Sequence, residues 1–364
     1  MHRSGTSAFV RVLNLLGCDL PKTVMGANKS NLAGHWESTP VCRLDDRILA
    51  SAGSDWDDWL ELNPGWLKSP KAEEFREQAL SVLQDEFGAS RLFVLKDPRI
   101  CRLVPFWLGV LEDAGIRPLI VFPLRNPLEV AASLEQRNGF EAGLGHLFWL
   151  RHVLDAEFAS RGVPRFFTGY DRLVNEWARI MEEAQAALNI VWPRMSPHVA
   201  AEIEAFLSKQ YRHHKEDIEA VLENPRLSDW LRGAYQILGG WVAAGENPQD
   251  FAALDRIRAD FNSAAPAFSR LIAAGKTATG KFTQADRMLA ETQAKLAKAE
   301  RARAAAQEEA ACQATELREV RRQLRQCERQ IERLKTASRT PGGMAKDDGN
   351  KAGAGLQVAA TPVK

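Results

Sequence analysis

The sequence lacks the patterns that would place it in several large classes of protein. Its five cysteines, Cys18, Cys42, Cys101, Cys312 and Cys327, form no C-x-x-C pair and have no Cys/His spacing, which argues against a zinc site and a disulfide framework. A reducing compartment, the cytoplasm, is therefore expected. No apolar run approaches the roughly 18 residues of a membrane span. With 48 basic and 47 acidic residues, the chain also lacks the charge excess that favours nucleic acid as a partner.

The chain has no Walker motif for nucleotide phosphates, but it has a different loop of small residues near its start. His2-Arg3-Ser4-Gly5-Thr6-Ser7 runs directly into an apolar helix. Backbone N–H groups and the positive end of the helix dipole meet there, while Arg3, Thr6 and Ser7 add a charge and two hydroxyl donors. The loop predicts a site for a phosphate or sulfate group. The alternative is an ordinary helix cap.

A predicted strand, Leu119–Leu124, leads to a second group of polar residues. Arg125 closes the strand, Asn126 is suited to cap the next helix and Pro127 to open it. Ser133 follows on the second turn of that helix. An arginine at a strand end and a serine on a helix flank are each ordinary alone, so the pair becomes informative only through the family resemblance described below.

Another short apolar segment, Arg91–Leu95, is predicted to be a buried strand that ends in Lys96-Asp97-Pro98. Pro98 breaks the strand, and this places the Lys96 ammonium where open α/β sheets bind ligands, outside the carboxyl ends of the strands. The alternative role for Lys96 is a structural salt bridge with Asp97 or another acid.

Gly34-His35-Trp36-Glu37 forms a polar loop before a helix expected from about Pro40 to Ala52. An acidic residue beside a tryptophan is a plausible mouth of an active site. Glu37 is the candidate general base and His35 its competitor. The alternative is that Glu37 merely begins a helix, where acidic residues are favoured.

These motifs together resemble the sulfotransferase family, which uses 3′-phosphoadenosine 5′-phosphosulfate as sulfuryl donor. The first loop is similar to the family's 5′-phosphosulfate loop, and R-N-P with a serine eight residues after the arginine is similar to its 3′-phosphate motif. K-D-P resembles the lysine motif of tyrosylprotein-type and related bacterial members, and G-H-W-E is similar to bacterial members. The resemblance implies that the donor is bound by Arg3, Ser4, Gly5, Thr6, Ser7, Arg125 and Ser133.

The same resemblance implies how the chemistry is divided. Arg3 and Lys96 would neutralise the transferring sulfuryl group, Glu37 would remove the acceptor's proton, and no metal would take part. The acceptor is a hydroxyl whose class, glycan, lipid or peptide, the sequence does not identify.

The expected fold is an α/β domain over residues 1–215, a three-layer parallel sheet with helices on both faces. Further helices are expected over about 72–87, 102–115, 127–137 and 177–188, and a last short strand and turn over Pro164–Leu173. In the resembled family a central strand precedes the phosphosulfate loop, and no such strand precedes His2 here. We therefore expect the natural protein to begin upstream of Met1, with a Val/Ile/Leu-rich run of about five residues just before it.

Beyond the α/β domain the composition becomes helical. Residues 216–280 are expected to be a helical extension, 281–337 a coiled coil that makes a homo-oligomer, and 338–364 a disordered tail. Arg303 and Gln313 interrupt the heptad seam. The seam positions are Leu289, Thr292, Leu296, Ala299, Arg303, Ala306, Ala310, Gln313, Leu317, Val320, Leu324, Cys327, Ile331 and Leu334.

Two other functions compete with sulfuryl transfer. A nucleotide-dependent kinase would need a Walker-type lysine and a magnesium-binding acid, and the loop supplies neither in the usual place. The stronger alternative is a non-catalytic scaffold, in which the nucleotide fold is degenerate and the coiled coil is the working part.

Overall fold

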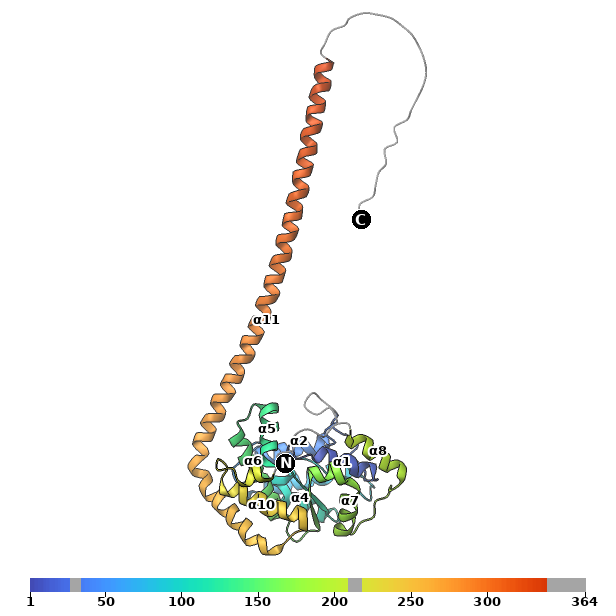
Figure 1. The fold of residues 1–364 in the computed structure, drawn as a ribbon, viewed down its shortest axis with the longest axis vertical. Coiled ribbons are helices and arrows are strands. Elements are labelled where there is room, and N and C mark those ends of the chain that lie inside the picture. The colour runs from blue at the N-terminus through green and yellow to red at the C-terminus, as the bar shows by residue number, and fades with distance from the viewer. Residues whose placement is uncertain (27–33, 209–217, 339–364) are drawn as a thin grey trace, which may run out of the picture. The chain divides into compact units, whose positions relative to one another are not determined.

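The structure, a computed structural model, describes residues 1–26, 34–208 and 218–338. The chain divides into two compact units, Met1–Ala273 and Ala274–Lys364 (Figure 1). Most of the described residues are helical. None of the helices within these ranges combines the length and the apolar character that crossing a bilayer requires.

The sheet of the first unit consists, in the described ranges, of two parallel strands, β1 (Ile120–Leu124) and β2 (Arg165–Gly169). Their register pairs Ile120 with Arg165 at one end and Leu124 with Gly169 at the other. Both strands lie where the sequence predicts them. The three-layer sheet expected from the sequence is wider than this pair, so what the structure shows is helices around a small parallel sheet.

The strand predicted over Arg91–Leu95 does not form. Its described backbone pairing is one isolated parallel bridge, between Phe93 and Asp19. Asp19 N–H donates to Leu92 O at 2.8 Å, and Val94 N–H donates to Asp19 O at 3.0 Å. A strand needs hydrogen-bonded neighbours along its length, about 4.8 Å away. The prediction of a buried strand is wrong in both respects: Leu92–Leu95 is only half-buried, and Asp19 is its one bridge partner among the described residues.

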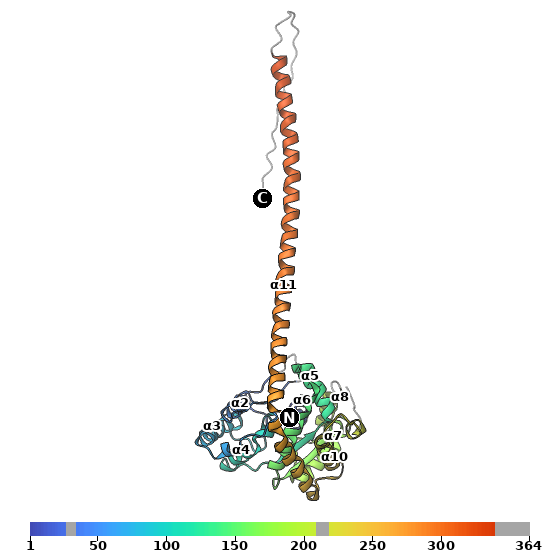
Figure 2. The ribbon, with the colours of Figure 1, turned by 90° about the vertical axis from the view of Figure 1, so that its left-hand side faces the viewer.

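Most helices of the first unit pack in three hydrophobic groups. The first group joins α2 (Thr39–Ser51), the 3₁₀ helix η1 (Pro64–Lys68), α3 (Pro70–Phe87) and α4 (Ile100–Asp113), and Figure 2 shows α2, α3 and α4 together on one side of this unit. The second group joins α1 (Thr6–Leu15), α7 (Tyr170–Leu188) and α8 (Pro197–Ser208).

The third hydrophobic group surrounds the sheet. It joins β1 and β2 to α5 (Pro127–Asn138), α6 (Ala142–Ala159), α10 (Asp229–Ala244) and the start of α11 (Phe251–Ala337). The short α9 (Ile218–Leu222) adds Val221 to it, and the 3₁₀ helix η2 (Pro248–Asp250) precedes α11. Helices after residue 217, which the sequence analysis treats as an extension, thus bury apolar side chains in the same core as the sheet.

Local sequence explains where several helices begin. The side chain of Asn126 accepts a hydrogen bond from Leu128 N–H at 2.9 Å, and Pro127 occupies the first position of α5, as the sequence predicts. Ser38 and Ser69 cap α2 and α3 in the same way. These caps satisfy N–H groups that a helix start would otherwise leave without partners.

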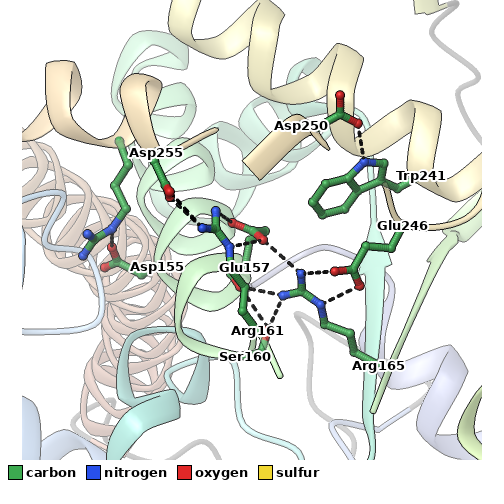
Figure 3. Close-up of polar contacts among 10 residues, drawn as sticks. Asp155, Glu157, Ser160, Arg161, Arg165, Trp241, Glu246, Asp250 and Asp255 are labelled. Atoms are coloured by element: carbon green, nitrogen blue, oxygen red, sulfur yellow. Dashed lines mark hydrogen bonds and ion pairs between the residues drawn. The ribbon is translucent and has the colours of Figure 1, made fainter. Parts of the chain in front are cut away.

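A network of ion pairs ties β2 to the helices beside it. Arg165 on β2 lies between Glu157 of α6 and Glu246, with N···O distances of 3.0 and 2.6 Å (Figure 3). Arg161 lies between Glu157 and Asp255 of α11, at 2.8 Å from each. We call Glu157, Arg161, Arg165, Glu246 and Asp255 the β2 network. Each of its two guanidinium groups lies between two of its three carboxylates, so both arginine charges are compensated.

The described part of the second unit is the continuation of α11. The apolar residues of the predicted seam are each more than half exposed in the single chain. The predicted disordered tail, 338–364, lies outside the described residues apart from Ser338. The exposed apolar seam residues are Leu289, Leu296, Leu317, Val320, Leu324, Ile331 and Leu334.

Candidate functional site

The predicted anion loop lies at the start of α1. Thr6 is the first residue of the helix, and Gly5 at its N-cap has a φ of 78°. Arg3 also has a positive φ, 64°, and Ser4 between them is buried. Because glycine has no side chain, the N-cap residue offers no side-chain oxygen to the N–H groups of Thr6 and Ser7, and its carbonyl oxygen accepts only from Ala8 and Phe9. The positive end of the helix is therefore directed at the loop without a built-in cap.

Only glycine fits at position 5. The positive φ already disfavours a side chain, and a Cβ atom placed on Gly5 would collide with the ring of Tyr170. Tyr170 is buried at the first position of α7, directly after β2. The guanidinium of Arg125 lies over the same ring, 5.1 Å from its centroid. Tyr170 thus has a packing role and holds the loop against the ends of both strands.

Arg125 and Ser133 both contact the loop at Arg3. Arg3 Nε donates to Ser133 Oγ at 2.7 Å, and Arg125 Nη1 donates to the carbonyl oxygen of Arg3 at 2.9 Å. Arg125 Nε also donates to Glu129 Oε2 at 2.7 Å. The end of β1 and the helix that follows it therefore meet the loop through a guanidinium and a hydroxyl, groups that suit a phosphate.

Lys96 and Glu37 form an ion pair beside the same loop, and their side chains are only 10% and 7% exposed. Lys96 Nζ also donates to His35 O at 3.0 Å and to Ser7 Oγ at 3.5 Å. Asp97, the other acid considered for Lys96, pairs with Arg99 instead. The lysine and the candidate base are thus brought together from segments about 60 residues apart in sequence and held at the first turn of α1.

His35, the competing candidate base, lies in the same place. Burial lowers the pKa of His35, and the charges of Lys96, Arg137 and Arg3 lower it further, while Glu37 opposes them. Its Nε2 atom is buried and has no hydrogen-bond partner among the described residues. A neutral imidazole can accept a proton at a ring nitrogen that has no hydrogen-bond partner. His35 therefore stays an alternative to Glu37 as the general base.

Positive charges converge on the loop. Burial and the charge of Arg125 both lower the pKa of Arg3. Burial, Arg3 and Arg99 lower the pKa of Arg137, which Glu37 only partly opposes. Neighbouring positive charges make each other's charged form less favourable, and a bound anion relieves this repulsion. We call Arg3, Lys96, Arg125 and Arg137 the cation-rich site.

Sequence analysis missed Arg137. Its guanidinium lies over the ring of Trp56, 5.6 Å from the centroid, and its charge reaches both His35 and Arg3. A signal for it existed. Arg137 is four residues after Ser133 on α5, and residues at this spacing lie on the same helix face.

One cluster in the site has the residue types of a metal centre. Ligand atoms of Glu37, Cys42 and Asp97 lie within 4.8 Å of one another, and all three residues are buried. Lys96 and Arg99 already neutralise the two carboxylates. Burial, with Asp97 beside it, raises the pKa of the Cys42 thiol far above its usual range. A protonated thiol and two paired carboxylates do not fit a cation, because metal ligands must be deprotonated and available.

No protein-family model, no curated protein and no solved structure matches this chain. The function of the site therefore has to be inferred from the contacts and charges of its own residues. Those contacts join four separate segments at the start of one helix: the loop 2–7, the segment 35–37, Lys96, and the stretch from Arg125 to Arg137.

Proposed function

We propose that this chain is a sulfotransferase, which moves a sulfuryl group from 3′-phosphoadenosine 5′-phosphosulfate to the hydroxyl of a glycan, lipid or peptide. The observation that carries the proposal is the convergence of the cation-rich site and Glu37 on the uncapped start of α1. The resemblance of the individual motifs to that family names the donor. The wider parallel sheet and the cytoplasmic setting expected from the sequence belong to the same proposal.

The residues present fit a donor with two anionic ends. The first turn of α1, Ser7 and Lys96 would hold the 5′ end, and Arg125 and Ser133 would hold the 3′-phosphate. Arg3 lies between the two sets, since it contacts Ser133 through its side chain and Arg125 through its carbonyl oxygen. A phosphate that binds at Ser133 must therefore share or replace the hydrogen bond from Arg3.

The donor, when bound, supplies an activated sulfuryl group on its 5′-phosphate. In the reaction the bond from sulfur to that phosphate oxygen breaks, a bond from sulfur to the acceptor oxygen forms, and Glu37 receives the acceptor's proton. Protonation removes the carboxylate charge that faces Lys96. The ammonium is then released to the negative charge that develops on the leaving phosphate, which is where positioned cations contribute most to catalysis.

The decisive experiment is calorimetry of the full chain with adenosine 3′,5′-bisphosphate, the product of the donor, in buffer without divalent metal. We expect binding, and we expect weaker binding of the 5′-monophosphate, because only the bisphosphate can use Arg125 and Ser133. Equal affinity for the two nucleotides would contradict the assignment of the 3′-phosphate. No binding of either would contradict the proposed function.

A second candidate function, a non-catalytic coiled-coil scaffold, is favoured by one observation. The seven apolar seam residues of α11 are exposed in the single chain, and such a seam buries its side chains when a second helix pairs with it. This function predicts self-association without nucleotide binding. Self-association together with nucleotide binding would instead give an enzyme that is also an oligomer.

Two exposed cysteines make the seam testable. Cys327 is a seam position, whereas Cys312 is not, and both are exposed on α11. In a parallel, in-register pair of helices, mild oxidation should join two chains through Cys327. We expect the covalent dimer to persist in Cys312→Ser and to disappear in Cys327→Ser. A monomer by light scattering, with neither variant changing the pattern, would refute the coiled coil.

A further inference from the structure

Arg137 is the member of the cation-rich site that the proposed function leaves without a role. It lies on α5 four residues after Ser133, which is about 6 Å further along the helix axis. Arg125 precedes α5, so this step leads away from the residues proposed to hold the 3′-phosphate. Arg137 therefore continues one helix face from the donor site to the neighbouring part of the surface.

Aromatic rings surround the side chain of Arg137. Its guanidinium lies over the ring of Trp56, 5.6 Å from the centroid. The Trp56 ring also packs edge-on against His2, with centroids 4.7 Å apart, and against Phe140 at 5.9 Å. We call His2, Trp56, Arg137 and Phe140 the Trp56 wall. All four residues are half-buried, so part of each is accessible to a bound molecule.

Two buried arginines fix the segment that carries Trp56. The carbonyl oxygens of residues 58–60 accept hydrogen bonds from Arg102 and Arg151, at 2.7 to 2.8 Å. The side chains of both arginines are 0% exposed. Three successive backbone groups are thus held from the interior of the unit. The Trp56 wall is therefore shaped before any ligand arrives, which lowers the entropy lost on binding.

Arg137 forms no ion pair with any residue that the structure describes, whereas Lys96 and Arg125 each pair with an acid. Its Nε atom donates to Asn138 Oδ1 at 2.6 Å. Its two Nη atoms form no hydrogen bond within the described part of the chain. The Trp56 ring attracts the guanidinium but leaves its charge in place. A half-buried cation with two unused donors favours an anionic ligand.

Arg137 also lies near the groups that carry the reaction. Burial lowers the pKa of Arg137, and the charge of Glu37 opposes that shift. Burial lowers the pKa of His35 and of His2, and the charge of Arg137 lowers both further. Charges of this kind act over roughly 10 Å or less in salt solution. A molecule that touches Arg137 can therefore reach the candidate base as well.

The two imidazole groups near Arg137 have hydrogen-bonding capacity to spare. Nε2 of His2 and Nε2 of His35 are buried and have no partner in the described ranges. Their lowered pKa values keep both rings neutral at pH 7. A neutral imidazole nitrogen either donates or accepts, and a hydroxyl group can do the converse in each case. Several hydroxyl groups on one molecule would satisfy both rings, whereas an apolar lipid chain would satisfy neither.

We propose that the acceptor is an acidic saccharide whose carboxylate binds Arg137 beside the Trp56 wall. Its hydroxyl groups would pair with His2 and His35, and one of them would face Glu37. A carboxylate matches the paired N–H donors of a guanidinium. The aromatic rings of the wall would pack on the apolar face of the sugar. The inference rests on the proposed function and makes Arg137 a residue that determines specificity.

The test compares acceptors that differ only in charge. The full chain and labelled donor are supplied with a mixture of oligosaccharides of glucuronic and galacturonic acid. A second reaction uses the same mixture after its carboxyl groups have been converted to primary amides. We expect kcat/KM to be at least about tenfold higher for the acidic mixture, since a charge-assisted contact is lost in the amides.

Substitution of Arg137 then assigns the preference. Arg137→Gln should raise KM for the acidic mixture about 10- to 100-fold with kcat nearly unchanged, so that the two mixtures become equivalent. Arg137→Lys should restore part of the preference. Arg179→Gln, at an exposed arginine of α7, is the matched control and should leave the preference intact.

Equal kcat/KM for the two mixtures would overturn the inference, and so would a preference that survives in Arg137→Gln. Faster transfer to the acidic peptide Glu-Asp-Tyr-Glu-Asp than to the acidic saccharides would contradict the commitment to a saccharide. The inference and the proposed function can fail separately. Binding of adenosine 3′,5′-bisphosphate without transfer to any of these acceptors would contradict the inference alone. Failure to bind the bisphosphate would contradict the proposed function, and the inference with it.

Discussion

Two regions of the first unit hold partly buried arginines in opposite ways. In the β2 network, Arg161 and Arg165 lie between carboxylates, and hydrogen bonds to Glu157 and Asp255 raise the pKa of Arg161 against the cost of burial (Figure 3). In the cation-rich site, Lys96 and Arg125 pair with Glu37 and Glu129, but burial and neighbouring cations lower the pKa of the other two members, Arg3 and Arg137.

The comparison separates a structural role from a binding role. In the β2 network the guanidinium groups are paired with carboxylates. This pairing stabilises one conformation and does not favour the binding of a further ion. Converging like charges cost folding free energy, and a bound anion would recover that cost. A region of this kind at a helix start is where a phosphate or sulfate is most strongly favoured.

The largest expected effect lies at Glu37, the carboxylate that pairs with Lys96. Glu37→Gln should leave binding of adenosine 3′,5′-bisphosphate nearly unchanged and lower turnover by about two to four orders of magnitude, the usual contribution of a positioned general base. Transfer of labelled sulfate from the donor measures this. His35→Asn is the control, and a loss confined to that variant would move the role of base to His35.

In the β2 network the expected loss is of stability. Arg165→Ala leaves Glu246 and part of Glu157 without their partner and should lower the free energy of unfolding by about 3 kcal/mol, as broken buried ion pairs do. Urea denaturation measures it. Arg179→Ala, at an exposed pair with Glu183, is the control and should cost less than about 1 kcal/mol. Equal losses would mean that burial is not what distinguishes the network.

Substitutions in the same two regions should also differ in their effect on nucleotide binding. Arg125→Ala removes a charge-assisted contact and should weaken the bisphosphate about 10- to 100-fold while changing the 5′-monophosphate little. Arg165→Ala, studied where it is folded, should change neither. Calorimetry with both nucleotides checks this, and a matching loss in Arg165→Ala would show that the comparison between the regions is wrong.

The smallest expected effect is on the pH dependence of binding. Burial and the cations around it lower the pKa of His35, so an anion placed among those cations would raise that pKa toward its ordinary value. Binding would then take up a proton, and affinity for the bisphosphate should increase a few-fold as the pH falls from about 7.5 to 6. Calorimetry in buffers of different ionisation enthalpy measures the proton. His35→Asn should abolish the trend, and release of a proton would contradict it.

Much of the site could be predicted because its signals are local. Asn126 and Pro127 begin α5 through capping chemistry, and Gly5 begins α1 where a positive φ is needed. The positions of Arg125 and Ser133 relative to those helix starts follow from short spacings. Capping and turn formation depend only on residues that are neighbours in the sequence, so they can be predicted from the sequence alone.

What could not be predicted depends on distant neighbours. Leu92–Leu95 has strand composition, but whether it becomes a strand is decided by what lies beside it, and Asp19 is its one described bridge partner. The partner of Lys96 could equally have been Asp97 by sequence, and packing decides for Glu37. α10 has no sequence signal that ties it to β2, yet Trp241 packs edge-on against Phe167 with ring centroids 5.0 Å apart.

The contact between Gly5 and Tyr170 has a consequence for the speed of binding. The ring fills the space above Gly5, and Arg125 lies over that ring, so the loop has little freedom to rearrange. A nucleotide therefore meets a receptor that is already shaped, and little ordering entropy is lost on association. The rearrangement that binding still requires is the breaking of the Arg3–Ser133 hydrogen bond. This is a side-chain motion on the nanosecond scale, whereas a loop closure would take milliseconds.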